Sequence, residues 1–275
     1  MPGATNSPGT PAKNTASMNQ AERWHTITLD EVDSTNNYLR DHCAGQEHAI
    51  ILVTAEHQSA GRGQRGNSWE SERSRNLIFS LQVHPQLPVS HIFSLSEACA
   101  LAIRDALATY TKDIEVKWPN DIYWHDKKIA GILIETSLTG KQIETGIIGV
   151  GVNINQRHFL SDAPNPVSLS LILDRETDRQ EVMERIMEQF TANMGCLQSG
   201  EFNALHQRYM QVLYRRQGFH PYSDEEGKFM AEILSVEPSG HLILGDEQGR
   251  QRRYAFKEVQ FIAPAPLSLV GEQEC

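Results

Sequence analysis

The sequence contains few of the features that mark secreted or membrane-spanning proteins. Its four cysteines are far apart and form no Cys-x-x-Cys pair, which favours reduced, buried side chains in a reducing compartment. No apolar run approaches the roughly 18 residues that a membrane span requires. The N-terminus also lacks the apolar core of a signal peptide. We therefore expect a cytoplasmic protein that makes no use of a membrane.

Positive charge and metal-ligand spacings are also scarce. Acidic residues outnumber basic ones by 35 to 25, and the formal net charge of −10 argues against a nucleic-acid partner, because no face is forced to be basic. The histidines show no His-x-x-x-His or similar spacing, so no transition metal is predicted. The Gly-x-Ser-x-Gly turn of hydrolases and the Gly-x-x-x-x-Gly-Lys-Ser/Thr phosphate loop are both missing.

The chain of 275 residues can bury one sizeable core and leave enough for a small second domain. Residues 1–22 are rich in small and polar residues and cannot offset their ordering entropy, so a disordered tail is predicted. We expect a main domain over 23–214, a C-terminal domain over 215–265 and a second tail over 266–275. Short apolar segments broken by turn-forming residues predict a small β-barrel for the C-terminal domain.

Apolar periodicity predicts an α+β fold for the main domain, with a central mixed or antiparallel sheet. A short apolar segment over 27–32 precedes side chains that favour helix N-caps. Apolar residues that recur at steps of three and four predict helices. Short apolar or alternating runs predict strands, and these are joined mostly by tight turns, as in an antiparallel meander. The predicted helices are 90–110, 179–196 and 202–214, and the predicted strands are 49–54, 76–83, 114–118, 122–124, 129–135 and 142–154.

The segment over 56–69 is rich in glycine and arginine. Gly61, Gly63 and Gly66 satisfy Gly-x-Gly-x-x-Gly, but a dinucleotide fold needs a helix at the third glycine, and 67–76 has no helical period. A loop with free backbone N–H groups and two arginines suits an anion cradle or a lid. A solvated surface loop is the structural alternative.

Three further segments indicate a function only when they are considered together. The stretch 117–121 places a lysine, an amide and a carboxylate at a turn, which ordinary turn chemistry also explains. Lys128 precedes an apolar strand, where it could reach an anion or lie in water. Gly149 and Gly151 interrupt another apolar strand, which indicates either close approach of a ligand or backbone, or a bulge.

Taken together and in order, these segments resemble the biotin protein ligase family. The resemblance covers about residues 27–155 and extends loosely to the C-terminus. It implies a class II synthetase-like catalytic domain followed by a small SH3-like barrel. The matching motifs are Asp33-Ser34-Thr35-Asn36, Gln58 with Gly61-Arg62-Gly63, Lys117-Trp118-Pro119-Asn120-Asp121, Lys128-Ile129-Ala130-Gly131 and Gly151-Val152-Asn153.

The resemblance implies two adjoining subsites and a few catalytic residues. Catalytic roles fall to Arg62, Lys128 and Asp121, with Mg²⁺ entering with ATP near Asp121 and not fixed by the protein alone. Gln64 stands where most members carry arginine, and the adjacent Arg65 is the charge that could replace it. The implied biotin-binding residues are Ser34, Thr35, Asn36, Gln58, Gly61, Arg62, Gly63, Gln64, Lys128 and Gly131, and the implied ATP-binding residues are Arg65, Trp69, Lys117, Asn120, Asp121 and Asn153.

The implied activity is ATP-dependent biotin protein ligation. Biotin would first become biotinyl-5'-AMP, and the biotinyl group would then pass to a lysine of a biotin carboxyl carrier domain. Only about 20 residues of low-complexity sequence precede the first motif, so we expect a monofunctional ligase without the N-terminal DNA-binding domain of the family's repressors. A monomer or a homodimer fits equally well.

Alternatives from other functional classes stay open at the level of the sequence. A lipoate or octanoate transferase would share the fold class, although the motifs fit the biotin branch better. A non-catalytic, biotin-responsive regulatory module would bind biotin without ATP-dependent release of pyrophosphate. An unrelated nucleotide-binding protein would require all of these ordered matches to coincide by chance.

Overall fold

The computed structural model describes residues 24–43, 45, 50–63, 67–160 and 165–262. The tails predicted over 1–22 and 266–275 lie outside these ranges, as do Gln64 and Arg65. Within the described ranges, no helix has both the length and the apolar character needed to cross a membrane.

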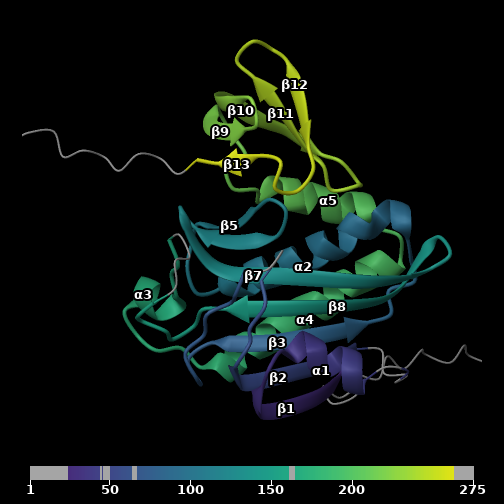
Figure 1. The fold of residues 1–275 in the computed structure, drawn as a ribbon, viewed down its shortest axis with the longest axis vertical. Helices are drawn as coiled ribbons and strands as arrows, with labels where there is room; N and C mark the ends of the chain where they lie inside the picture. The colour runs from purple at the N-terminus through teal and green to yellow at the C-terminus, as the bar shows by residue number, and fades with distance from the viewer. Residues whose placement is uncertain (1–23, 44, 46–49, 64–66, 161–164, 263–275) are drawn as a thin grey trace, which may run out of the picture.

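A mixed eight-stranded sheet forms the centre of the molecule (Figure 1). Its order is β1-β2-β3-β8-β7-β6-β5, and β4 pairs with β8 outside this path. The first two strands are parallel and the other pairs antiparallel, which confirms the predicted fold class. The strands are β1 (His25–Val32), β2 (Ile50–Gln58), β3 (Leu77–Val83), β4 (Leu87–Pro88), β5 (Ile114–Lys117), β6 (Asp121–Trp124), β7 (Lys127–Thr139) and β8 (Gln142–Val152).

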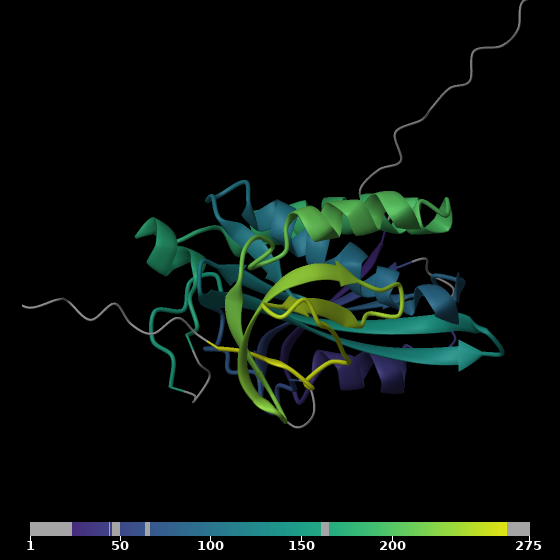
Figure 2. The ribbon, with the colours of Figure 1, turned by 90° about the horizontal axis from the view of Figure 1, so that it is seen from above.

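Helices cover both faces of this sheet (Figure 2). The helix α1 (Thr35–His42) makes the crossover that a parallel β1–β2 pair requires. On the opposite face, α2 (Ile92–Leu107) is buried on nearly all sides, because α4 (Arg179–Gln198) and α5 (Phe202–Gln211) pack over it. The short elements are η3 (Val89–His91) and α3 (Leu169–Leu173).

The third predicted helix was too long at its C-terminal end. It ends at Gln211 rather than 214, because the following backbone pairs with β5. The Val116 N–H donates to the carbonyl of Val212 (2.8 Å), and the Tyr214 N–H donates to the carbonyl of Val116 (2.9 Å). Long-range hydrogen bonds therefore override the local helical pattern.

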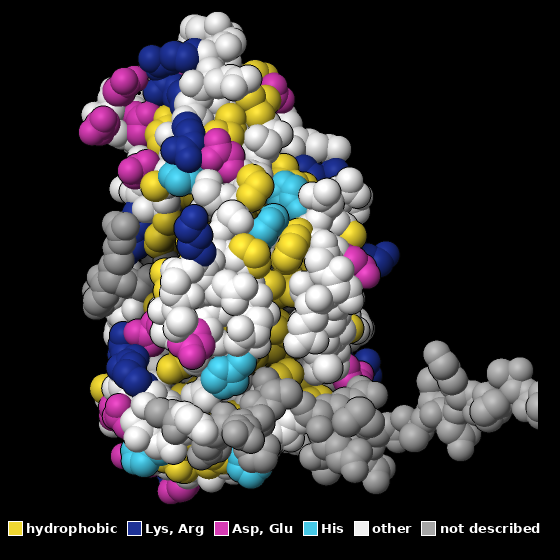
Figure 3. Space-filling view, turned by 90° about the vertical axis from the view of Figure 1, so that its right-hand side faces the viewer, with side chains coloured by type: hydrophobic (Ala, Val, Ile, Leu, Met, Phe, Trp, Pro, Cys, Tyr) yellow, Lys and Arg dark blue, Asp and Glu magenta, His cyan; other side chains and the backbone are white. Residues whose placement is uncertain are grey.

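A second, antiparallel sheet of five strands follows, with the order β12-β11-β10-β9-β13. This sheet is compatible with a small SH3-like barrel. Acidic and basic side chains intersperse over it at the top of Figure 3, and Arg252, only 14% exposed, bridges the carboxylates of Asp224 and Asp246. The strands are β9 (His220–Asp224), β10 (Gly227–Val236), β11 (Leu242–Asp246), β12 (Gln251–Tyr254) and β13 (Gln260–Phe261).

Trp118 joins the C-terminal sheet to the central one. Its indole Nε1 donates to the carbonyl of Gly240 (2.9 Å), and its ring meets Phe256 edge-on. From the other side, the hydroxyl of Tyr209 donates to the carbonyl of Pro119 (2.7 Å). The turn after β5 is therefore held by both the C-terminal sheet and α5.

Candidate active site

A cavity of about 840 Å³ lies beside α1 and the strands β7 and β8. It gathers most of the residues singled out from the sequence, although they come from five separate segments. Gly61 and Asn120 are not among its lining residues. The predicted residues that line it are Ser34, Thr35, Asn36, Gln58, Arg62, Gly63, Trp69, Lys117, Asp121, Lys128, Gly131 and Asn153.

One end of the cavity rests on a hydrogen-bonded group, which we call the polar floor. It consists of the buried Thr35, Asn36 and Ser80 and the half-buried Gln58. Both the N–H and the hydroxyl of Thr35 donate to Gln58 Oε1 (2.8 and 3.0 Å). The Thr35 and Ser80 hydroxyl oxygens lie 2.6 Å apart, and Ser80 donates to Asn36 Oδ1 (2.6 Å). Helix α1 starts at Thr35, so its first turn is fixed to β2 and β3.

The polar floor contains fewer hydroxyl hydrogens than hydroxyl contacts. The two hydroxyl hydrogens of Thr35 and Ser80 serve three contacts, to Gln58, to each other and to Asn36, and a hydroxyl donates only once. Since Ser80 donates to Asn36, the Thr35 hydrogen must be shared between Gln58 and Ser80. A ligand that donates a hydrogen bond to this group would supply the missing hydrogen.

Ser34 precedes this group as the N-cap residue of α1. Its side chain makes no capping hydrogen bond, although helix capping was the structural alternative for a serine at this position. It is 3% exposed and lines the cavity. Its hydroxyl is therefore not committed to the end of the helix.

Three glycines on β7 and β8 make room for large side chains of the site. A Cβ atom at Gly151 would lie 2.2 Å from the Trp69 indole, and one at Gly131 would lie 2.8 Å from the same ring. A Cβ at Gly149 would lie 2.4 Å from Asn36 Oδ1. The pairing of β7 with β8 is regular here, so these glycines mark close approach and not a bulge.

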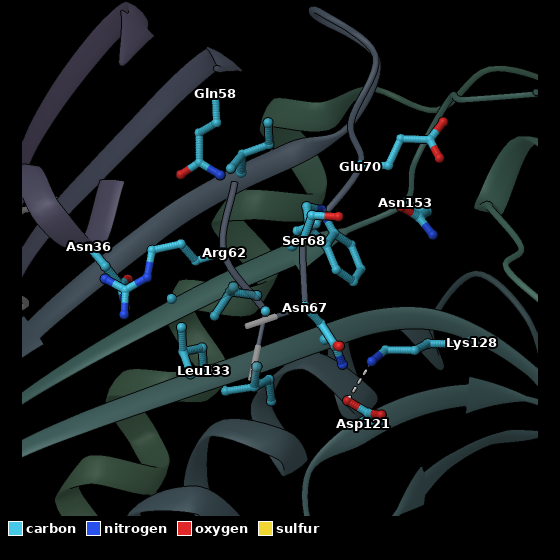
Figure 4. Close-up of a pocket in the computed structure, with 18 of the residues that line it drawn as sticks. Asn36, Gln58, Arg62, Asn67, Ser68, Glu70, Asp121, Lys128, Leu133 and Asn153 are labelled. Atoms are coloured by element: carbon cyan, nitrogen blue, oxygen red, sulfur yellow. Dashed lines mark ion pairs between the residues drawn. The ribbon is translucent and has the colours of Figure 1, made fainter. Parts of the chain in front are cut away.

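The opposite end of the cavity carries positive charge, and we call Lys117, Asp121, Tyr123 and Lys128 the lysine end. The Lys128 ammonium lies 2.8 Å from Asp121 Oδ1, as Figure 4 shows. Lys117 donates to the hydroxyl of Tyr123 (3.0 Å). Burial lowers the pKa of Lys117 and nearby Lys128 adds to the effect, while Asp121 opposes it. An anionic ligand would relieve this crowding of charge.

The structure does not bring the three predicted catalytic residues together. Lys128 and Asp121 are in contact, but Arg62 lies near Asn36 at the other end of the cavity (Figure 4). Its guanidinium donates to Asn37 Oδ1 (2.9 Å) and pairs with Glu135 Oε1 (3.0 Å). The roles of Gln64 and Arg65 fall outside the described residues.

Three further predicted residues make hydrogen bonds that hold the site in place. Gly61 stabilises the loop, because its carbonyl accepts a hydrogen bond from the N–H of Trp69 (3.0 Å). Asn120 is buried, and its Nδ2 donates to the Ser96 hydroxyl on α2 (2.9 Å). Asn153 donates to the Val167 carbonyl (3.1 Å).

Residues 29–153 match the model of the biotin/lipoate A/B protein ligase family. The chain carries a domain of that family. This finding confirms the family resemblance seen in the sequence motifs, and the match spans α1, the polar floor, the glycines and the lysine end.

Relatives of the biotin/lipoate ligase domain extend the likeness. The chain is 28% identical over 237 residues to a biotin–acetyl-CoA-carboxylase ligase of Paracoccus denitrificans, covering 81% of this chain and 95% of that protein. It is 36% identical over 149 residues to the bifunctional ligase/repressor BirA of Salmonella typhimurium, covering 53% of this chain and 46% of the relative. The chain thus spans about half the length of that relative.

Solved structures share the fold. A biotin protein ligase from Aquifex aeolicus in complex with biotin and ATP superposes with a TM-score of 0.71 at 24% identity, over 86% of this chain and 99% of that chain. A biotin protein ligase from Leishmania major in complex with biotinyl-5-AMP gives a TM-score of 0.56 at 22% identity, over 84% of this chain and 98% of that chain.

Several residues that line or support the cavity were not predicted from the sequence. Ser80 is fully buried on β3, and its only signal is a lone hydroxyl in an apolar strand. Phe256 and Lys257 line the cavity from the loop before β13, where the sequence shows no motif. Two polar atoms of predicted residues, Trp69 Nε1 and Asn153 Oδ1, are buried without a hydrogen-bond partner in the described part of the chain.

Proposed function

We propose that this protein is an ATP-dependent biotin protein ligase, which forms biotinyl-5'-AMP and transfers the biotinyl group to a lysine of a biotin carboxyl carrier domain. One observation carries the proposal: a single cavity has a neutral, hydrogen-bonding floor at one end and a pair of lysines at the other. Such a cavity suits a neutral polar ring linked to an anionic group.

The polar floor matches the chemistry of biotin's ureido ring. That ring presents one carbonyl acceptor and two N–H donors, and Thr35, Asn36 and Gln58 offer both kinds of partner. Biotin's sulfur ring and aliphatic chain need an apolar surface. Such a surface is provided by the cavity-lining residues Ile78, Phe79, Ile132, Leu133 and Val150.

The lysine end suits the phosphates of ATP. Lys117 and Lys128 place two ammonium groups beside one carboxylate. Mg²⁺ binds through one or two carboxylates together with substrate phosphates, and Asp121 is a carboxylate that fits this need. The described residues include no cluster of three or more acidic, histidine or cysteine side chains that would hold the ion alone. The bound ion would neutralise phosphate charge.

The reaction proceeds by two substitutions. An oxygen of the biotin carboxylate attacks the α-phosphorus of ATP, and the bond to pyrophosphate breaks. The lysine amine of the carrier then attacks the carbonyl carbon, loses a proton and releases AMP. Lys128 stabilises the negative charge that develops on the phosphate, and Asp121 orients the attacking amine. The predicted role of Arg62 concerns the biotin end, where its guanidinium lies.

Three further statements belong to the proposal. The carrier is a biotin carboxyl carrier domain, since the Paracoccus relative is named for a carboxylase. The enzyme acts in the cytoplasm, as a monomer or a homodimer. Nucleic acid is not a partner, in keeping with the net charge of −10.

The test is transfer of labelled biotin to a purified carrier domain, with and without ATP and Mg²⁺, alongside Arg62→Ala. We expect ATP-dependent labelling of one carrier lysine and a strong loss in the variant. Biotin binding without ATP-dependent release of pyrophosphate would instead support a regulatory module. Competition by lipoate or octanoate and not by biotin would identify the related transferases.

A further inference from the structure

Glu135 on β7 collects hydrogen bonds from three side chains at the biotin end of the cavity. We propose that Glu135 is a positioning residue for biotin binding. Its carboxylate fixes the amide of Asn36 and holds Arg62 beside it. The inference rests on the proposed function. Glu135 does not line the cavity, so it would act only through these two residues.

The two carboxylate oxygens of Glu135 have different partners. Oε2 accepts from Asn36 Nδ2 (2.9 Å) and from the Arg40 guanidinium (3.0 Å). Oε1 accepts from the Arg62 guanidinium (3.0 Å). Asn36 and Arg40 are four residues apart on α1, and side chains at this spacing share one face of a helix. Glu135 therefore links α1 on one side to the loop that carries Arg62 on the other.

The position of Glu135 follows from the alternation along β7. Leu133 lines the cavity, and Glu135 follows it by two residues on the same face of the strand. This face continues the cavity floor to a point beneath α1. A carboxylate in this position meets the buried Asn36 directly.

The carboxylate decides which way the Asn36 amide faces. An ionised carboxylate only accepts hydrogen bonds, so it must meet the NH₂ group, and the Asn36 oxygen is left for the Ser80 hydroxyl. The side chain is fixed in position, because Asn36 is 3% exposed and its oxygen lies over Gly149, so the only freedom left is exchange of the amide oxygen and nitrogen. A neutral amide in place of the carboxylate would tolerate either orientation.

Charge keeps this carboxylate ionised. Burial alone would raise the pKa of Glu135, but the hydrogen bond from Asn36 and the charges of Arg62 and Arg40 outweigh it and lower the pKa below its usual value. Removal of Glu135 would leave two arginines beside each other at the biotin end.

Arg40 provides the matched control. It contacts the same Oε2 atom, but its side chain is 48% exposed and it does not line the cavity. Arg40→Gln removes one charge from Glu135 and leaves the contacts to Asn36 and Arg62 in place. A merely structural role of the cluster would affect Arg40→Gln and Glu135→Gln alike, because each change breaks the same ion pair.

The experiment compares wild type, Glu135→Gln, Arg40→Gln, Arg62→Gln and the Glu135→Gln/Arg62→Gln double variant. Biotin binding is measured by calorimetry without ATP, and KM for biotin and kcat are measured by biotin-dependent pyrophosphate exchange. For Glu135→Gln we expect Kd and KM to rise about tenfold or more, with kcat within about threefold of wild type. Arg40→Gln should stay within about twofold in all three constants.

The Kd of the double variant for biotin should not exceed that of the single variant with the higher Kd, because both changes disrupt one arrangement. If Glu135→Gln unfolds, Glu135→Asp, with the charge retained on a shorter side chain, is expected to raise Kd for biotin in the same direction. Equal Kd values for Glu135→Gln and Arg40→Gln, or multiplicative effects in the double variant, would overturn the inference alone. A wild-type protein that binds no biotin would overturn the proposed function as well.

Discussion

The Lys128 ammonium and the Asp121 carboxylate meet at 2.8 Å across the adjacent strands β7 and β6. The Lys128 ammonium could exchange its contact with this protein carboxylate for a contact with a substrate phosphate. Lys128→Met should therefore lower biotin-dependent pyrophosphate exchange by about 100-fold or more, the usual effect of losing one group that stabilises a developing anion.

Lys127→Met is the matched control for this change. Lys127 is the exposed neighbour on the same strand and does not line the cavity, so exchange should remain within about twofold of wild type. A loss of less than about fivefold in Lys128→Met would remove this lysine from the chemistry.

Ser80 allows a test of the polar floor from outside the cavity. Ser80→Ala deletes a fully buried hydroxyl and leaves Asn36 Oδ1 without its donor. The free energy of unfolding should fall by about 1–3 kcal/mol, and the Kd for biotin should rise several-fold. Urea denaturation and calorimetry measure the two effects. Ser239→Ala, in an exposed turn of the C-terminal sheet, should change stability by less than about 0.5 kcal/mol, and an equal loss in both variants would contradict the role of Ser80.

Gly151→Ala tests the close approach of Trp69 to β8. The new Cβ would overlap the indole at 2.2 Å, so the ring must leave its place on the strand. Such overpacking costs about 1–3 kcal/mol, and we expect pyrophosphate exchange to fall at least tenfold. By contrast, Gly195→Ala in α4 meets no atom within 4 Å and should stabilise the helix by about 0.5–1 kcal/mol. If pyrophosphate exchange is unchanged in Gly151→Ala, the position of Trp69 against β8 is not needed for the reaction.

The pair formed by the buried Glu97 on α2 and the half-buried His206 on α5 should make stability depend on pH. The two side chains meet at 2.6 Å. The hydrogen bond to Glu97 raises the pKa of His206 above 6.5, and burial raises the pKa of Glu97 above 4.5, although His206 and His91 oppose that shift. Both groups bind protons more tightly in the folded state, so stability should fall as pH rises through the raised pKa of His206.

Urea denaturation between pH 6 and pH 8 measures this effect. Glu97→Gln removes the charged partner of His206. In this variant, the free energy of unfolding should decline less steeply over the same pH range. Neither residue of the pair lines the cavity. A decline of unchanged slope in Glu97→Gln would contradict the assignment to this pair.

Local patterns in the sequence were sufficient to predict most elements of the fold. The helix predicted over 90–110 is observed at Ile92–Leu107, and the strand predicted over 76–83 at Leu77–Val83. The strand predicted over 49–54 continues to Gln58, because β1 pairs with it from Ile51 to Gln58. Where neighbours in space extend or shorten an element, periodicity alone could not predict its ends.

The site was predictable only as far as its motifs reach. Thr35, Gln58 and Lys128 were identified because they belong to short matching segments. Ser80 and Glu135 were not, since their importance depends on which strands become neighbours in the sheet and on the register between them. No local property of an apolar strand reveals that one of its residues will lie beneath a helix from another part of the chain.

The pairing of β3 with β8 joins Leu77 to Val152 and Val83 to Gly146. Contacts between such distant segments form slowly, because closing the intervening chain costs entropy before any contact repays it. Ser80 lies on one of these strands and Gly149, beneath Asn36, on the other. A chain that has not yet made this strand pair therefore cannot complete the end of the cavity at which we propose that biotin binds.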